Sequence, residues 1–91
     1  MPFEYDPQKS AKNLDKHGIS FEDAQRLWES PYVVVPSAGY SEKRYIVLGV
    51  IDGKNWTAAI TYRNGNVRII SVRRSRKKEV QVYERCTQDA R

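Results

Sequence analysis

Apolar and polar residues alternate along the middle of the chain, which is the pattern of β-strands that bury one face. The strands that it predicts are Tyr32–Val35, Arg44–Ile51, Asn55–Arg63 and Val67–Arg74. Asp52-Gly53 and Asn64-Gly65 separate the last three of them, and both pairs are typical of tight hairpin turns. Phe3–Tyr5 also alternates and is predicted to be a short edge strand. The pattern therefore predicts an antiparallel meander of about four strands.

Helix signals stand on both sides of this meander. Asp6-Pro7 begins a helix that ends at Gly18, because aspartate caps a first turn and glycine adopts the left-handed backbone that closes a last one. A second helix, capped by Ser20, ends before Pro31, and the tail from Ser75 is predicted to be a third, capped by Ser75 itself. The apolar face of the second helix carries Phe21, Ala24, Leu27 and Trp28. The predicted fold class is α+β, with two short N-terminal helices packed on the meander and a C-terminal helix.

The hairpin turns predict which residues share a face of the sheet. With a two-residue turn at Asn64-Gly65, one face carries Trp56, Ala58, Ile60, Tyr62, Val67, Ile69, Ser71 and Arg73. The opposite face carries Thr57, Ala59, Thr61, Arg63, Arg68, Ile70, Val72 and Arg74. The first face is the more apolar and is predicted to form the core under the helices. A two-residue turn at Asp52-Gly53 would place Arg44 opposite Thr61, beside Arg63 and Arg68, whereas a slip of one residue would invert that strand.

Charge is distributed unevenly along the 91 residues, whose net charge is +5. Residues 1–31 hold four Lys or Arg against six Asp or Glu, a net charge of −2, and residues 32–91 hold twelve against five, a net charge of +7. A basic half with arginines on its strands indicates nucleic acid or an acidic protein as the partner.

The amino-acid composition further limits the kind of protein that the chain can form. Hydrophobic residues make up 40% and aromatic residues 11% of the chain, which predicts an ordered fold forming a single domain over residues 1–91. Cys86 is the one cysteine, so an internal disulfide is excluded. The N-terminus lacks the pattern of a secretion signal and no apolar run approaches the length of a membrane span, so we expect a cytoplasmic protein. One His, one Cys and scattered acids predict neither a metal site nor a cofactor.

Several motifs are spread along the chain: Lys16-His17-Gly18, Ser20-Phe21-Glu22, Glu42-Lys43-Arg44-Tyr45 with Gly49, Arg68–Arg74, Glu79 and Tyr83. Together these motifs resemble the BrnT toxins. The resemblance implies a RelE-like fold and a metal-independent endoribonuclease, the toxin of a type II toxin–antitoxin pair, which cleaves RNA and inhibits translation and growth. It also implies a BrnA-type antitoxin with a ribbon-helix-helix part, through which the complex binds operator DNA and represses its own operon.

The arginines on the strands are the candidates for holding RNA. Arg44, Arg63 and Arg68 are predicted to bind the phosphate and its transition state, because a guanidinium contacts two phosphate oxygens at once. Arg73 and Arg74 are predicted to bind RNA beside them. For any single arginine, the alternative is a surface salt bridge or a solvated side chain.

Five further residues are candidates with open alternatives. His17 is the acid–base candidate because histidine is the side-chain type suited to proton transfer near neutral pH; alternatively, it caps the helix that ends there. Lys16 is a candidate for stabilising the charge of the transition state; alternatively, it only complements the helix dipole. Arg76 and Lys77 occupy a first helical turn, where cations are disfavoured, which indicates an RNA or acidic partner or a solvated tail. Tyr45 is a candidate for stacking an RNA base.

Two other functional classes remain open. The basic surface could serve a non-catalytic binding module for nucleic acid or an acidic antitoxin. It could also belong to a toxin-like subunit retained only in a transcriptional repressor complex. The enzyme class alone predicts that replacing an arginine lowers cleavage more than RNA affinity.

Overall fold

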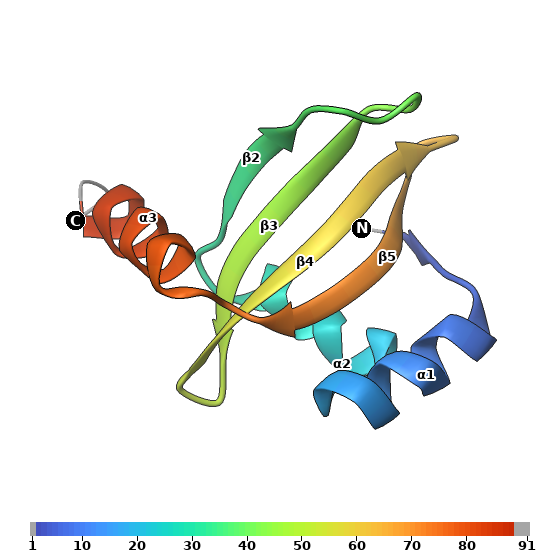
Figure 1. Ribbon diagram of the computed structural model, residues 1–91, viewed down its shortest axis with the longest axis horizontal. Helices are drawn as coiled ribbons and strands as arrows, with labels where there is room; N and C mark the ends of the chain where they lie inside the picture. Colours follow the sequence, from blue (N-terminus) through green and yellow to red (C-terminus); the bar gives the residue numbers. More distant parts are fainter. Residues whose placement is uncertain (1, 89–91) are drawn as a thin grey trace.

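A five-stranded sheet with strand order β1-β5-β4-β3-β2 is the centre of this computed structural model, which describes residues 2–88 (Figure 1). In chain order the elements are β1 (Phe3–Glu4), α1 (Pro7–His17), α2 (Phe21–Ala24), the 3₁₀ helix η1 (Gln25–Glu29), β2 (Val33–Ser37), β3 (Arg44–Ile51), β4 (Lys54–Arg63), β5 (Asn66–Arg74) and α3 (Lys77–Gln88). Strands β2 to β5 form an antiparallel meander, and β1 pairs parallel with β5. The α+β class, the meander, the edge strand and the C-terminal helix are confirmed.

Both predicted hairpin turns have two residues. The φ angles are 50° at Asp52, 77° at Gly53, 53° at Asn64 and 80° at Gly65, which is the left-handed backbone that this type of turn requires at both positions. The pairs that close the turns are Ile51 with Lys54 and Arg63 with Asn66. Turn chemistry therefore sets the register of three strands, including the predicted position of β3 against β4.

A β-bulge in β5 corrects the face assignment for the second half of that strand. Ile60 pairs with Ile69, but Ala59 pairs with Ser71, so Ile70 is the extra residue. An inserted residue reverses the alternation beyond it. Val72 is consequently a fully buried core residue, and Arg74 joins it on the core side, whereas Ser71 and Arg73 lie on the other face. The prediction for these four residues was wrong because it assumed an unbroken strand.

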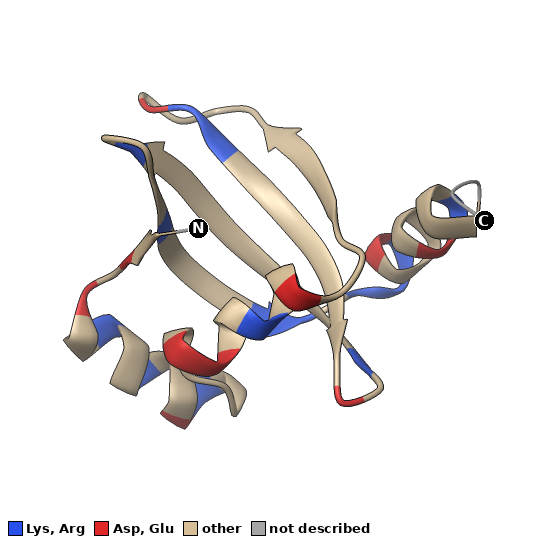
Figure 2. Cartoon of the chain, turned by 180° about the vertical axis from the view of Figure 1, so that it is seen from behind, with Lys and Arg blue, Asp and Glu red and all other residues tan. Residues whose placement is uncertain are grey.

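The helices α1, α2 and η1 cover one face of the sheet, and η1 crosses in front of the strands in Figure 2. The core between them contains Ile19, Phe21, Ala24, Leu27, Val47, Ile51, Trp56, Ala58, Ile60, Val67, Ile69 and Val72. The predicted second helix is α2 continued by η1, and its predicted apolar face packs into this core. We call the opposite side of the sheet the open face.

Gly49 lets η1 approach the sheet. A Cβ atom at this position would lie 2.7 Å from Leu27 Cδ2, closer than two carbon atoms can pack. Leu27 is fully buried. The absence of a side chain in the middle of β3 therefore makes room for a core side chain from η1.

The buried amide of Asn13 joins α1 to β5. Its Nδ2 donates to the carbonyls of Ile19 and Val72, at 2.8 and 2.9 Å, and its Oδ1 accepts from the Val72 backbone amide at 3.1 Å. Ser10, one turn earlier on the same helix, accepts a hydrogen bond from the Phe21 amide at 2.9 Å. Two polar side chains inside the core thus fix α1 against both α2 and the strand segment that follows the bulge.

The helix α3 lies against β2 and β3 on the open face and buries none of its own side chains fully. Glu79 attaches it: its carboxylate accepts two hydrogen bonds from Arg73, at 2.7 and 2.8 Å, and one each from Thr57 Oγ1 and the Arg76 amide. The helix begins at Lys77, so Arg76 takes the N-cap position predicted for Ser75, whose hydroxyl contacts Thr57 instead. A single carboxylate therefore determines much of the position of α3.

Protonation of Glu79 at acidic pH is expected to lower the free energy of unfolding. The hydrogen bonds from Arg73, with those from the Arg76 amide and Thr57, lower the pKa of Glu79 from 4.5 to about 2. A pKa lowered by folding adds stability that is complete above pH 4.5 and is lost as the pH falls toward 2. Because part of the Glu79 side chain is exposed to solvent, we expect it to contribute about 2 kcal/mol to the free energy of unfolding, which is less than the energy equivalent to the whole pKa shift.

Urea unfolding of Glu79→Gln between pH 7 and pH 2 measures this contribution. The variant should lose that stability at pH 7 and show a flatter pH dependence in acid than the unsubstituted protein. Glu84→Gln is the matched control, since Glu84 is exposed on the same helix. Equal pH profiles for Glu79→Gln and the unsubstituted protein would contradict the assignment.

Candidate functional site

Three arginines on three strands share the open face. Arg68 on β5 pairs with Thr61 on β4, and the β3–β4 register, continued one residue past Tyr45, places Arg44 opposite Thr61 from the other side. Neighbouring strands lie about 4.8 Å apart, so the Cα atoms of Arg44 and Arg68 are roughly 10 Å apart across Thr61. Arg63 follows two residues after Thr61 on the same face. We call Arg44, Arg63 and Arg68 the arginine cluster.

One carboxylate connects two members of the cluster. Glu42, in the loop before β3, lies with Oε1 3.6 Å from Arg44 Nη2 and with Oε2 3.6 Å from Arg63 Nη2. These distances are longer than those of charge-assisted hydrogen bonds, so Glu42 lies loosely between the two guanidinium groups. Arg68 lies 3.4 Å from the Glu4 carboxylate on β1. The cluster therefore already accommodates an anionic group between two of its cations.

Arg44 is the most firmly positioned member of the cluster. Its guanidinium carbon lies 4.1 Å from the centre of the Tyr40 ring, a distance at which a cation is attracted to the ring face. Within residues 2–88, Arg44 Nε is buried and has no hydrogen-bond partner. Thr61 fixes the adjoining loop by donating to the Lys43 carbonyl at 2.7 Å. An oriented guanidinium with an unpaired buried donor is suited to receive an anion.

Tyr40 and Glu42 were not predicted as site residues, although Glu42 belongs to one of the motifs found in the sequence. Both lie in the polar loop between β2 and β3, within four residues of Arg44. The signal available was this spacing: an aromatic residue and an acid close to a strand arginine. Only the folded loop shows that they reach Arg44, because a loop has no periodicity from which to infer direction.

Four of the predicted RNA-binding cations lie outside the cluster. Arg73 is on the open face, but it pairs with Thr57, four residues from Thr61 and roughly 13 Å along β4. Its ion pair with Glu79 raises the pKa of Arg73. Arg74 is on the core side of the sheet edge, 5.5 Å from the Trp56 ring centre. Arg76 and Lys77 are exposed at the start of α3.

Lys16 and His17 lie on the other side of the sheet from the cluster. They end α1, which packs on the core face, and the C-cap glycine after them has φ 79° and donates to the Leu14 carbonyl at 2.9 Å. That glycine, Gly18, lines a pocket with Trp56 at the far end of β4. The sheet therefore separates His17 and Lys16 from the arginine cluster.

Tyr45 also faces away from the cluster. It pairs with Ile60, whose side chain is in the core, and its ring meets that of Tyr62 edge-on with centres 5.1 Å apart. Tyr62 is on the predicted core side but is 52% exposed, since the upper part of the sheet extends beyond the helices (Figure 1). The aromatic ring beside the cluster is that of Tyr40.

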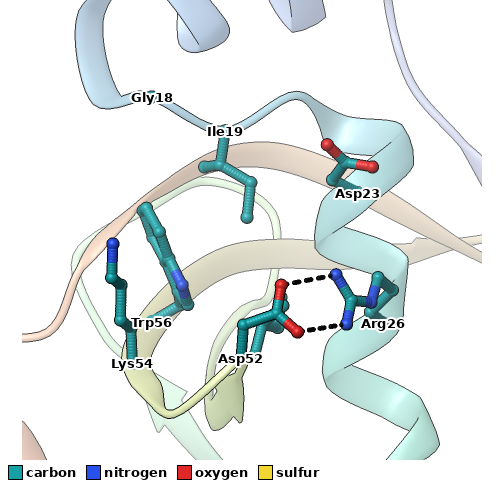
Figure 3. A pocket seen from close by; sticks show the side chains of 8 residues that line it. Gly18, Ile19, Asp23, Arg26, Asp52, Lys54 and Trp56 are labelled. Carbon is teal, nitrogen blue, oxygen red and sulfur yellow. Dashed lines mark hydrogen bonds and ion pairs between the residues drawn. The ribbon is translucent and has the colours of Figure 1, made fainter.

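A pocket of about 210 Å³ opens on the helix-covered side (Figure 3). Its lining residues are Gly18, Ile19, Asp23, Arg26, Ile51, Asp52, Lys54 and Trp56. Arg26 donates two hydrogen bonds to the Asp52 carboxylate, at 2.7 and 3.0 Å, which lowers the pKa of Asp52 and raises that of Arg26. This pair ties η1 to the β3–β4 turn. The pocket is smaller than typical small-molecule sites, and we assign it a structural role.

Within residues 2–88, no three His, Cys, Asp or Glu side chains are grouped as a metal ion would require. None of the helices in that range is both long enough and apolar enough to span a membrane.

The chain matches the model of a known protein family. The family model described as "Ribonuclease toxin, BrnT, of type II toxin-antitoxin system" matches residues 5–79. The matched range contains all three members of the arginine cluster and ends at Glu79, the residue that attaches α3. No curated protein matches the chain.

Proposed function

Because the chain belongs to the BrnT family of ribonuclease toxins from type II toxin–antitoxin systems, we propose that its arginine cluster holds the RNA phosphate at which cleavage occurs. The observation that carries this proposal is the single carboxylate of Glu42 between Arg44 and Arg63. A carboxylate is planar and a phosphate is tetrahedral, but each presents two anionic oxygens that a guanidinium can bind with two donors. A phosphate in the position of the Glu42 carboxylate would contact Arg44 and Arg63. Arg68 lies nearby on β5, the strand next to that of Arg63.

The proposed reaction is attack of a ribose 2′-oxygen on the adjacent phosphorus, without a metal ion. The 2′-hydroxyl gives its proton to a base as the bond from the 2′-oxygen to phosphorus forms. The bond from phosphorus to the 5′-oxygen breaks, and the departing oxygen takes a proton from water. The products are a 2′,3′-cyclic phosphate and a 5′-hydroxyl. Negative charge grows on the non-bridging oxygens in the transition state, and fixed cations stabilise it there. The arginine cluster supplies this charge in our proposal.

Glu42 is our candidate for the base. A phosphate bound by Arg44 and Arg63 displaces the Glu42 carboxylate, which stays beside the site because Glu42 precedes Arg44 by only two residues. A displaced carboxylate is then free to accept the proton of the 2′-hydroxyl. General bases contribute about 10²- to 10⁴-fold to a rate.

Replacing Glu42 by glutamine separates binding from cleavage. Glutamine cannot accept the proton, so the cleavage rate at saturating RNA should fall about 100-fold. RNA affinity should stay equal or rise, because the carboxylate that competes with phosphate is gone. Single-turnover cleavage and fluorescence polarisation with a labelled RNA measure the two quantities.

Glu4→Gln is the control for Glu42→Gln, since Glu4 also pairs with a cluster arginine but sits on β1. It should change the cleavage rate only a few-fold. If Glu42→Gln cleaves as fast as the unsubstituted protein, the base is another group. If RNA affinity falls instead, Glu42 does not occupy the phosphate position.

In the cell, the proposed function is that of a cytoplasmic toxin whose RNA cleavage inhibits translation and growth. A BrnA-type antitoxin inhibits it, and the complex binds operator DNA through the antitoxin. A binding role without cleavage is the second candidate, favoured by one observation: the chain has one histidine, and it lies across the sheet from the cluster. Expression of the chain without its antitoxin separates the two, because only the enzyme leaves cut cellular RNA.

A further inference from the structure

An apolar groove of about 220 Å³ runs between α3 and the open face. Its lining residues are Val35, Ile46, Leu48, Lys78, Glu79 and Val82. Val35 and Val82 are 37% and 39% exposed although both are aliphatic. The groove thus leaves apolar surface from both the sheet and α3 in contact with solvent.

The groove leads into the arginine cluster. Arg44, Ile46 and Leu48 alternate along β3 and so share the open face, and Val35 and Ser37 on β2 pair with Ile46 and Arg44. Leu48 is four residues from Arg44, which is roughly 13 Å along the strand. A ligand lying along β3 would therefore pass from apolar side chains to guanidinium groups within a few residues.

The chemistry of this surface indicates the ligand. A volume of about 220 Å³ is small for a drug-sized molecule but accommodates aliphatic side chains. RNA has no aliphatic groups to fill an apolar groove. At the basic end, Glu42 already demonstrates that a carboxylate fits between Arg44 and Arg63, and Lys78 lies at the rim. An acidic polypeptide with neighbouring aliphatic residues complements both ends.

We propose that the groove and the arginine cluster together bind one segment of the antitoxin, with aliphatic side chains in the groove and carboxylates on Arg44 and Arg63. The segment replaces Glu42 at the position that a phosphate would take. Antitoxin and RNA then exclude each other, which accounts for inhibition by direct competition. The groove part of this proposal stands on its own, and the competition rests on the proposed function.

A charge placed in the groove tests the proposal. Val82→Glu puts a carboxylate among the groove side chains, at a position exposed enough to tolerate it, and Gln81→Glu makes a similar change one residue away, at an exposed position outside the groove. The probe is the full-length antitoxin encoded in the same operon, titrated calorimetrically. Val82→Glu should bind it at least tenfold more weakly, and Gln81→Glu should bind it like the unsubstituted protein.

Activity shows whether the competition holds. Val82→Glu alone should cleave RNA at the unsubstituted rate, yet resist an antitoxin concentration that inhibits the unsubstituted toxin. Failure of the unsubstituted protein to cleave RNA would overturn the proposed function, while the calorimetric comparison would still test the groove.

Hydrogen exchange of the unsubstituted complex provides a test that needs no variant. Protection should appear in residues 33–37, 44–48 and 77–82. Protection confined to α1 and α2, or equal antitoxin affinity for both variants, would overturn the proposal. It would also be overturned if Val82→Glu instead broke a dimer of this chain or lowered its affinity for RNA, because the groove would then have another occupant.

Discussion

Arg44→Ala should lower the rate of RNA cleavage at saturating RNA by about 10²- to 10³-fold. The Tyr40 ring and the burial of Nε hold this guanidinium in one orientation, so its charge needs little reorganisation when the phosphate charge grows. Alanine removes that charge from the transition state. RNA affinity should fall by about tenfold only, because one phosphate contact among several is lost.

The matched control for Arg44→Ala is Arg85→Ala, which removes an exposed cation from the last turn of α3. It changes the net charge equally, so any effect of overall charge on RNA binding appears in both variants. Cleavage by Arg85→Ala should remain within a few-fold of the unsubstituted rate. Equal losses of cleavage and affinity in Arg44→Ala would assign the arginine cluster to binding alone.

Asn13→Asp should lower the free energy of unfolding by about 3 kcal/mol at pH 7. Aspartate has the shape of asparagine but donates no hydrogen bond, so its carboxylate would face the carbonyls of Ile19 and Val72, which Asn13 now satisfies. The carboxylate would keep the hydrogen bond from the Val72 amide, but its charge would be buried against two carbonyl groups that have lost their donor. Natural domains have only about 5–15 kcal/mol of stability, so this loss is severe.

Urea unfolding followed by tryptophan fluorescence measures the effect of Asn13→Asp. Gln8→Glu is the control, because it replaces an amide by a carboxylate on the exposed side of the same helix. It should change stability by about 0.5 kcal/mol at most. A similarly small loss in Asn13→Asp would mean that the Asn13 hydrogen bonds contribute little to joining α1 and β5.

The arginine cluster was predictable because local turn chemistry determines register. Asn64-Gly65 and Asp52-Gly53 adopt the backbone that a two-residue turn needs, and a fixed register determines which side chains share a face. The two turns alone predict that Arg44, Arg63 and Arg68 share one face of the sheet. The apolar face of α2 and η1 was predictable for the same reason, since helical periodicity is a local property.

Two features were not predictable because they depend on tertiary contacts. The bulge at Ile70 is invisible in the run Ile69–Val72, whose residues could face either side; packing of Val72 and its hydrogen bonds to Asn13 select the bulged register. The approach of Tyr40 and Glu42 to Arg44 depends on the path of a loop that has no periodic pattern.

Analysis of RNA ends after incubation with the purified protein in EDTA tests whether the arginine cluster supports cleavage without a metal ion. We expect cuts that carry 2′,3′-cyclic phosphate and 5′-hydroxyl ends, present with the unsubstituted protein and absent with Arg44→Ala. RNA left intact by the unsubstituted protein, cleavage that stops when EDTA is added, or 5′-phosphate ends would contradict this expectation.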